Sequence, residues 1–128
     1  MIAAPVSVQL DETGRTVVQP DIVVLSDSKK CRDGQIYGAP DLVIEIVSEE
    51  SRSRDYFLKL SEYRISGVRE YWIADWEKGK ITVYRFDGED FELEVYALTG
   101  QIPVGVIPGM QIDFGDTVRW NYIINYSR

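Results

Sequence analysis

Two acidic side chains and one basic side chain are placed where they could act together on a substrate. Asp21 opens one apolar run, Glu45 lies within the apolar run 42–47, and Lys59 follows in a segment of helical spacing. Alternate residues of a strand face opposite sides of a sheet, and the neighbours of Glu45 are apolar on both sides. An ionised carboxylate there is costly unless a cation or hydrogen-bond donors compensate it. We therefore expect Glu45 to have a function.

The types of these residues indicate metal-assisted chemistry on a phosphate ester. If the two strands are neighbours and the helix packs back across their ends, Asp21, Glu45 and Lys59 converge. Carboxylate oxygens, with the carbonyl of Ile46 as a further donor, are ligands that Mg²⁺ and Mn²⁺ prefer. Such an ion polarises a phosphodiester and activates a water, while a lysine orients that water or offsets charge in the transition state. Asp55, four residues before Lys59, is an accessory candidate.

Each of these residues also has an ordinary structural interpretation. Asp21 could be a turn or edge residue, and Glu45 could pair with an arginine from a helix. Asp55 and Lys59 stand at i and i+4, where a helical salt bridge contributes only about 0.3–0.5 kcal/mol. Asp41, which opens the strand that carries Glu45, is expected to cap the preceding turn rather than to bind metal.

The composition excludes several other chemistries. The chain has 128 residues, a net charge of −7, no histidine and one cysteine, Cys31. Without histidine, a Ser-His-Asp triad, a Cys-His pair and an imidazole-bound zinc site are excluded within this chain. The lone cysteine rules out an internal disulfide and fits a reducing compartment, so we expect a cytoplasmic protein. No apolar run reaches the roughly eighteen residues of a membrane span, and the first residues do not resemble a signal peptide.

The apolar pattern predicts a single domain over residues 1–128, rich in strands and with one clear helix. The helix is expected to end at Ser66, with Gly67 as its stop and an inward stripe of Tyr56, Leu60 and Tyr63. Strands are expected at 5–10, 16–19, 21–25, 41–47, 70–74, 81–86 and 91–96, with a loop at 26–37 and a loop with a short strand at 101–110. One helix cannot cover both faces of a strand that is apolar on both. We therefore expect a homo-oligomer or a partner chain to cover the open sheet face, or part of the domain to be missing.

Five segments, VVQPDIVVL, GAPDLVIEIVS, SRSRDYFLKLSEY, GVREYWIAD and ITVYRF, together resemble the Uma-two-type family of restriction-endonuclease-like proteins. The resemblance spans roughly residues 4 to 108. The family in turn resembles the PD-(D/E)XK phosphodiesterase superfamily, which implies an α/β (α+β) fold with a mixed sheet flanked by helices. Family members usually begin with a helix and a strand that have no counterpart here, so the N-terminal part of the core is expected to be missing.

The resemblance also implies roles for individual residues. It places the first metal-binding acid on Asp21 and the second acid on Glu45. The usual lysine would stand two residues after the second acid, where this sequence has Val47. In this family the lysine is thought to have moved to the following helix, which implies Lys59. The acid that family members carry on this helix corresponds to Asp55.

The sequence thus predicts a Mg²⁺- or Mn²⁺-dependent endonuclease that hydrolyses DNA, with Asp21 and Glu45 as metal ligands and Lys59 as the positive catalytic group. Two alternatives stay open: a catalytically inactive nuclease-fold domain for interaction or oligomerisation, and an enzyme that acts on another phosphate ester. The acidic total makes tight DNA binding by the isolated chain unfavourable. Candidate DNA contacts are the basic residues Lys29, Lys30, Arg32, Arg52 and Arg54.

Overall fold

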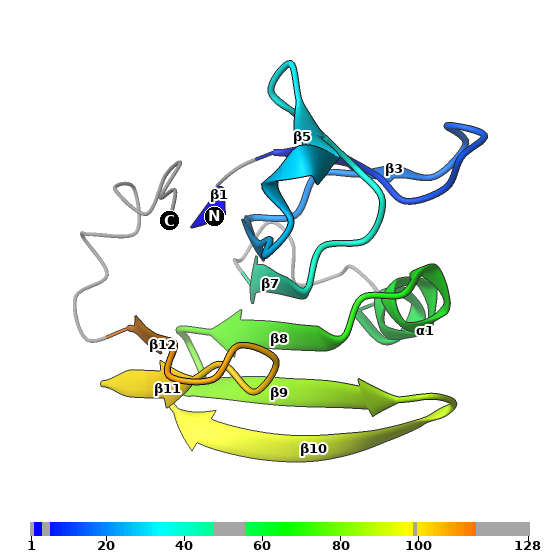
Figure 1. The fold of residues 1–128 in the computed structure, drawn as a ribbon. Helices are drawn as coiled ribbons and strands as arrows, with labels where there is room; N and C mark the ends of the chain where they lie inside the picture. Colours follow the sequence, from blue (N-terminus) through cyan, green and yellow to red (C-terminus); the bar gives the residue numbers. More distant parts are fainter. Residues whose placement is uncertain (1, 4–5, 48–55, 99, 115–128) are drawn as a thin grey trace.

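The computed structural model describes residues 2–3, 6–47, 56–98 and 100–114, which form an α+β arrangement with three sheets (Figure 1). The six-stranded sheet has the order β1 (Ile2–Ala3), β4 (Ile22–Val24), β7 (Leu42–Val47), β8 (Glu70–Asp75), β9 (Lys80–Asp87), β10 (Asp90–Ala97). The four-stranded sheet has the order β3 (Val17–Val18), β2 (Ser7–Gln9), β6 (Gln35–Tyr37), β5 (Cys31–Arg32). The third sheet pairs β11 (Gln101–Pro103) with β12 (Gln111–Asp113). In the described part of the chain, no helix is long and apolar enough to cross a membrane.

The centre of the large sheet is a parallel pair of strands. Leu42 of β7 pairs with Glu70 of β8, and the register continues to Val47 and Asp75. Parallel neighbours need a crossover connection, and the helix α1 (Tyr56–Ser66) lies between these strands in the chain. The other strand pairs of this sheet are antiparallel, so the sheet is mixed as the sequence predicted.

One face of the large sheet packs against α1 and the four-stranded sheet. This core contains Val8 and Ile36 from the small sheet, Val23, Val43 and Tyr71 from the large sheet, and Leu60 and Tyr63 from α1. The inward stripe predicted for the helix is confirmed for Leu60 and Tyr63, which are both buried. Figure 1 shows α1 beside β8, with β5 and β3 of the small sheet lying above β7.

The opposite face of the large sheet is covered by the chain itself. Its core contains Ile22, Ile44, Trp72 and Val83 from the sheet together with Ile102, Val104, Ile112 and Phe114 from the β11–β12 region. Ile102 and Val104 lie in the segment 101–110, for which the sequence predicts a loop with a short strand, whereas β12 at Gln111–Asp113 was not predicted. The argument that one helix leaves a face open was therefore wrong, because a β-hairpin covers that face. The homo-oligomer or partner chain stays a prediction, but an uncovered sheet face no longer supports it.

The helix ends as its sequence predicts. Gly67 has a φ of 99°, the left-handed conformation that a residue without a Cβ adopts readily. The Val68 amide donates to the Tyr63 carbonyl at 3.0 Å, and the Gly67 amide donates to the Arg64 carbonyl at 3.2 Å. This pattern satisfies carbonyls of the last turn and directs the chain into β8.

The predicted loop at 26–37 is structured instead. It contains a 3₁₀ turn, η1 (Ser28–Lys30), and the β5–β6 hairpin. The two residues between these strands are Asp33 and Gly34, with φ of 53° and 77°. Positive φ at both positions defines the type I′ turn, for which Asp-Gly is a preferred sequence. The Asp-Gly pair is therefore a hairpin signal within a stretch whose other polar residues predicted a loop.

Candidate active site

The register of β4 and β7 places the two predicted metal ligands side by side. Ile22 pairs with Ile44 and Val23 with Val43. Continuing this antiparallel register by one residue puts Asp21 opposite Glu45, and directly opposite residues project from the same face of a sheet. The Ile46 amide donates to Asp21 Oδ2 at 2.7 Å, which joins Asp21 to β7 next to Glu45. The prediction that these two strands are neighbours is confirmed.

The carboxylate of Glu45 is buried and held by two residues of α1. Lys59 Nζ lies 2.8 Å from Glu45 Oε2, and the Tyr63 hydroxyl donates to Oε1 at 3.3 Å. Lys59 and Tyr63 are four residues apart, so they project from the same side of the helix. Lys59 keeps 28% of its side chain exposed, whereas Glu45 has 2%. The helix therefore delivers a cation and a neutral donor to one buried acid.

Burial dominates the electrostatics of Glu45. It raises the pKa of the carboxyl group above its ordinary value, and the negative charge of Asp21 raises the pKa further. The hydrogen bond and charge of Lys59, and the hydrogen bond from Tyr63, act in the opposite direction. Because the net shift is upward, the ammonium of Lys59 compensates the buried charge only in part.

Two tyrosines behind Glu45 were not singled out from the sequence as site residues. Tyr63 and Tyr71 are both buried, with ring centroids 4.9 Å apart. The Tyr71 hydroxyl is buried and has no hydrogen-bond partner among the described residues. Burial, followed by the charge of Glu45, raises the pKa of both hydroxyl groups, so both stay neutral donors. Their signal in the sequence was the position of Tyr63, one helical turn after Lys59.

The oxygen donors of Asp21 and Glu45 are of the kind that fits Mg²⁺ when waters and substrate oxygens complete its coordination. Among the described residues, no three Cys, Asp or Glu side chains gather into a cluster that could hold a metal ion. Asp21 and Glu45 contribute two carboxylates, and Mg²⁺ is usually bound through one or two carboxylates together with waters and substrate phosphates. Asp55 lies outside the described residues, and its accessory role stays a prediction.

The candidate DNA contacts lie on η1 and the β5–β6 hairpin. Lys29 is exposed, while Lys30 Nζ donates to the Ala39 carbonyl at 2.9 Å. The Arg32 guanidinium lies 4.3 Å from the ring centre of Tyr37. Lys30 and Arg32 thus have structural partners as well as charge. Arg52 and Arg54 lie outside the described residues.

Asp41 has a structural role, but its carboxylate binds Ser26 rather than the preceding turn that it was predicted to cap. Its Oδ2 accepts hydrogen bonds from the Ser26 amide at 2.7 Å and from the Ser26 hydroxyl at 2.8 Å. The carboxylate thereby ties the end of β4 to the start of β7. This fixes the relative position of the two strands that carry Asp21 and Glu45.

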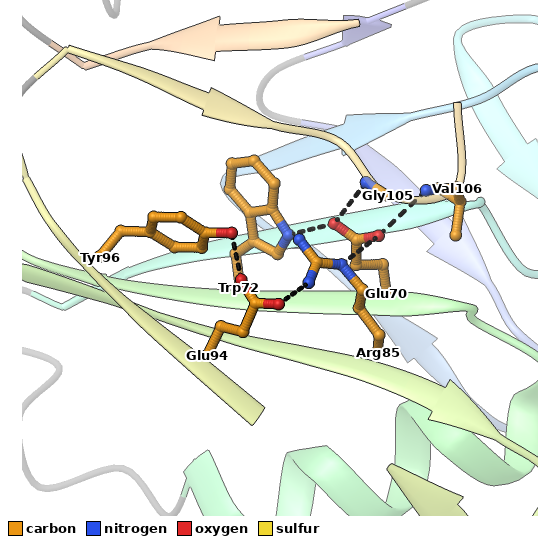
Figure 2. Close-up of polar contacts among 7 residues, drawn as sticks. All are labelled: Glu70, Trp72, Arg85, Glu94, Tyr96, Gly105 and Val106. Atoms are coloured by element: carbon orange, nitrogen blue, oxygen red, sulfur yellow. Dashed lines mark hydrogen bonds and ion pairs between the residues drawn. The ribbon is translucent and has the colours of Figure 1, made fainter. Parts of the chain in front are cut away.

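A second buried carboxylate, Glu70, lies on the other face of the sheet (Figure 2). Trp72 Nε1 donates to its Oε2 at 2.6 Å, and the Gly105 amide donates to the same oxygen at 3.3 Å. The Val106 amide donates to Oε1 at 3.1 Å, and Arg85 Nε lies 3.5 Å from Oε1. Glu70 therefore fastens the chain at 105–106 to the sheet. Glu70 was not predicted as a buried acid, although it opens an apolar strand, a signal similar to that of Asp21.

Gly105 is required by the close packing at Glu70. A Cβ at this position would lie 2.4 Å from Arg85 Nε and 2.8 Å from Glu70 Oε1. Arg85 also lies 2.9 Å from Glu94 through its NH1 group, and the Tyr96 hydroxyl donates to Glu94 (Figure 2). The cluster is thus a packed structural network.

The fold defines the class of protein. A mixed sheet flanked by a helix agrees with the restriction-endonuclease-like fold that the sequence resemblance implied. The Uma2 family model, described as "Putative restriction endonuclease", matches residues 1–115. The chain belongs to the Uma2 family, as its sequence motifs predicted.

A solved structure agrees on the fold. The crystal structure of "a putative nuclease belonging to DUF820" from Anabaena variabilis is similar to this chain with a TM-score of 0.67 and 22% sequence identity. The similarity covers 93% of this chain and 68% of that chain. No curated protein is detectably similar in sequence. The restriction-endonuclease-like fold predicted from the sequence is therefore confirmed.

Proposed function

We propose that this protein is a metal-dependent nuclease that hydrolyses phosphodiester bonds in DNA. The observation that carries the proposal is the convergence of Asp21, Glu45 and Lys59, which come from three separate segments, on one face of the sheet. The family description, which names a restriction endonuclease, supports DNA as the substrate. The two carboxylates would hold Mg²⁺ or Mn²⁺, with the carbonyl of Ile46 as a further oxygen donor.

Each residue of the site has a distinct task. The metal ion, when bound, supplies Lewis acidity and lowers the pKa of water. Asp21 and Glu45 would bind the ion, and the Tyr63 hydroxyl donates to Glu45 Oε1 and so holds this carboxylate in place. Lys59 is half-buried and ends in an ammonium, so it can orient the attacking water or offset negative charge on the phosphate. The rigid β4–β7 pair keeps the two acids in register before substrate binds.

DNA binding by this chain is expected to be weak and strongly dependent on salt. The net charge of −7 opposes the approach of a polyanion, and a few basic side chains must supply the local attraction. Lys29 is exposed on η1 and Arg32 is exposed on β5, so both can contact phosphate. Binding that falls steeply as salt increases would support these contacts.

The test is cleavage of supercoiled plasmid DNA with Mg²⁺ or Mn²⁺. The isosteric variant Glu45→Gln removes the charge of one metal ligand, and Glu12→Gln is the matched control because Glu12 is exposed in a distant turn. Wild type and Glu12→Gln should cleave, while Glu45→Gln should lose at least about a hundredfold in rate. Equal cleavage by Glu45→Gln and wild type would overturn the assignment.

A second function is favoured by one observation. Both oxygens of Glu45 already have hydrogen-bond partners, Lys59 and Tyr63, without any metal. The same fold could therefore be an interaction domain without catalysis. Calorimetry with Mn²⁺ separates the two functions: a nuclease site binds the ion in wild type and loses it in Glu45→Gln, whereas an interaction domain shows no binding in either.

A further inference from the structure

Strand β10 forms one edge of the six-stranded sheet. It has eight residues and pairs with β9 over its full length, from Asp90 with Asp87 to Ala97 with Lys80. Among the described residues, no strand pairs with the second hydrogen-bonding edge of β10, and Figure 1 shows β10 as the outermost strand. Natural proteins usually shorten, bulge, cover or charge such edges because an open edge templates strand pairing. A long, regular edge therefore requires an explanation.

One face of β10 exposes a row of large apolar side chains. Phe91, Leu93 and Val95 alternate along the strand and are 47%, 52% and 56% exposed. Phe91 contacts Tyr84 edge-to-face, with ring centroids 5.4 Å apart, and Tyr84 packs against the core on the α1 side of the sheet. The exposed row thus continues the apolar surface of the core out to the edge of the sheet. Scattered apolar residues are ordinary on a surface, but a contiguous row on an edge marks an interaction site.

The opposite face of β10 exposes a row of carboxylates. Asp90, Glu92 and Glu94 alternate with the apolar residues and are exposed. Arg85 lies 2.9 Å from Glu94, so one of the three acids has a cation beside it. An added strand would place its own alternating side chains next to these two rows. The edge therefore matches a strand that is apolar on one side and basic on the other.

A second copy of this chain does not match the edge. In a symmetric antiparallel pairing that keeps both apolar rows on one side, Leu93 lies opposite its own equivalent, and Glu92 then faces Glu94 of the second copy. Shifting the register by two residues places either Glu92 or Glu94 opposite itself. Like charges directly opposite each other destabilise a strand pair. Each of these symmetric registers therefore places carboxylate against carboxylate.

We propose that β10 is a docking edge for an extended segment of another protein in which apolar residues alternate with Lys or Arg. Main-chain hydrogen bonds to β10 supply affinity, as in other cases of strand addition. The apolar row and the carboxylate row together favour a partner strand in which apolar and basic residues alternate. This inference does not rest on nuclease activity, because β10 contributes none of the site residues.

The test uses a blocked synthetic peptide of alternating valine and lysine, matched in length to β10. A control peptide has the same composition with all lysines before all valines, and a second control alternates valine with glutamate. Amide hydrogen exchange should slow at alternate residues of β10 with the first peptide and remain unchanged with both controls. Equal binding of the block peptide would overturn the proposal, because it would show attraction by charge alone.

Two variants of the full chain sharpen the test. Leu93→Lys interrupts the apolar row and should weaken peptide binding by about tenfold. Ile65→Lys is the matched control, since Ile65 is 73% exposed on α1, and it should bind as wild type does. Both substitutions are at exposed positions, and circular dichroism checks that the variants fold. Concentration-dependent dimerisation that Leu93→Lys abolishes would overturn the proposal in favour of a second copy.

Discussion

Glu45 and Glu70 are two buried carboxylates in adjacent strands of one sheet, and they are satisfied in different ways. Glu45 is bound by the ends of two side chains, an ammonium and a phenol, and burial raises its pKa. Glu70 accepts hydrogen bonds from two backbone amides and an indole and lies beside a guanidinium. Side chains can move away when a ligand arrives, whereas backbone amides in a packed segment cannot. The difference indicates that Glu45 is available for function and that Glu70 is committed to structure.

The largest expected effect distinguishes the role of Lys59 from that of the proposed metal ligands Asp21 and Glu45. Lys59→Met keeps the length of the side chain and removes its charge. We expect the rate of DNA cleavage to fall by roughly 10²–10³-fold, because charge stabilisation in the transition state is lost, while Mn²⁺ binding measured by calorimetry persists. Glu45→Gln should lose both DNA cleavage and Mn²⁺ binding. If Lys59→Met lost metal binding while staying folded, Lys59 would have to be regarded as a structural partner of Glu45.

A reciprocal effect is expected at the structural carboxylate. Glu70→Gln replaces one acceptor oxygen by an amide donor that faces the indole or backbone N–H groups. We expect a loss of about 2–3 kcal/mol in the free energy of unfolding, measured by urea denaturation, because buried donors lose their acceptor. Mn²⁺ affinity per folded molecule should stay unchanged. If Mn²⁺ affinity fell by more than the unfolded fraction of Glu70→Gln explains, Glu70 would also affect metal binding. The assignment of Glu70 to structure alone would then be wrong.

The smallest expected effect concerns pH. Because the folded-state pKa of Glu45 is raised above its ordinary value of 4.5, the folded protein binds this proton more tightly than the unfolded chain. Stability contributed by the protonated group is present below the ordinary pKa and is lost as pH rises through the folded pKa. Tyr63→Phe removes a hydrogen bond that lowers this pKa, so it should lower stability by about 1 kcal/mol above the folded pKa.

The measurement is urea denaturation of wild type and Tyr63→Phe across the weakly acidic range. The difference in stability should grow with pH and then level off once Glu45 is ionised in both proteins. Tyr84→Phe is the control, because Tyr84 also stacks with Tyr71 but has no hydrogen bond to Glu45 among those that the structure shows. A difference that is independent of pH would mean that Tyr63 acts on Glu45 through packing alone.

Much of the fold was predictable because local pattern decided it. Alternation and apolar runs located β4, β7, β8, β9 and β10, and the Gly67 stop located the end of α1. The β5–β6 hairpin was also encoded locally, in its Asp-Gly turn, but the polar residues around it suggested a loop. The short strands β11 and β12 were harder to predict, because their stability depends on packing against the large sheet.

The sequence by itself determined that Glu45 is an acid in a strand apolar on both faces, and that Lys59 and Tyr63 share one side of a helix. These properties follow from residue type and from the periods of strand and helix. Only the tertiary structure decided that Asp21 lies opposite Glu45, that Lys59 Nζ lies 2.8 Å from its carboxylate, and that the β11–β12 region covers the far face. Strand register and the packing of distant segments are long-range properties. They depend on which burial is most favourable for the whole chain, and no single segment encodes that.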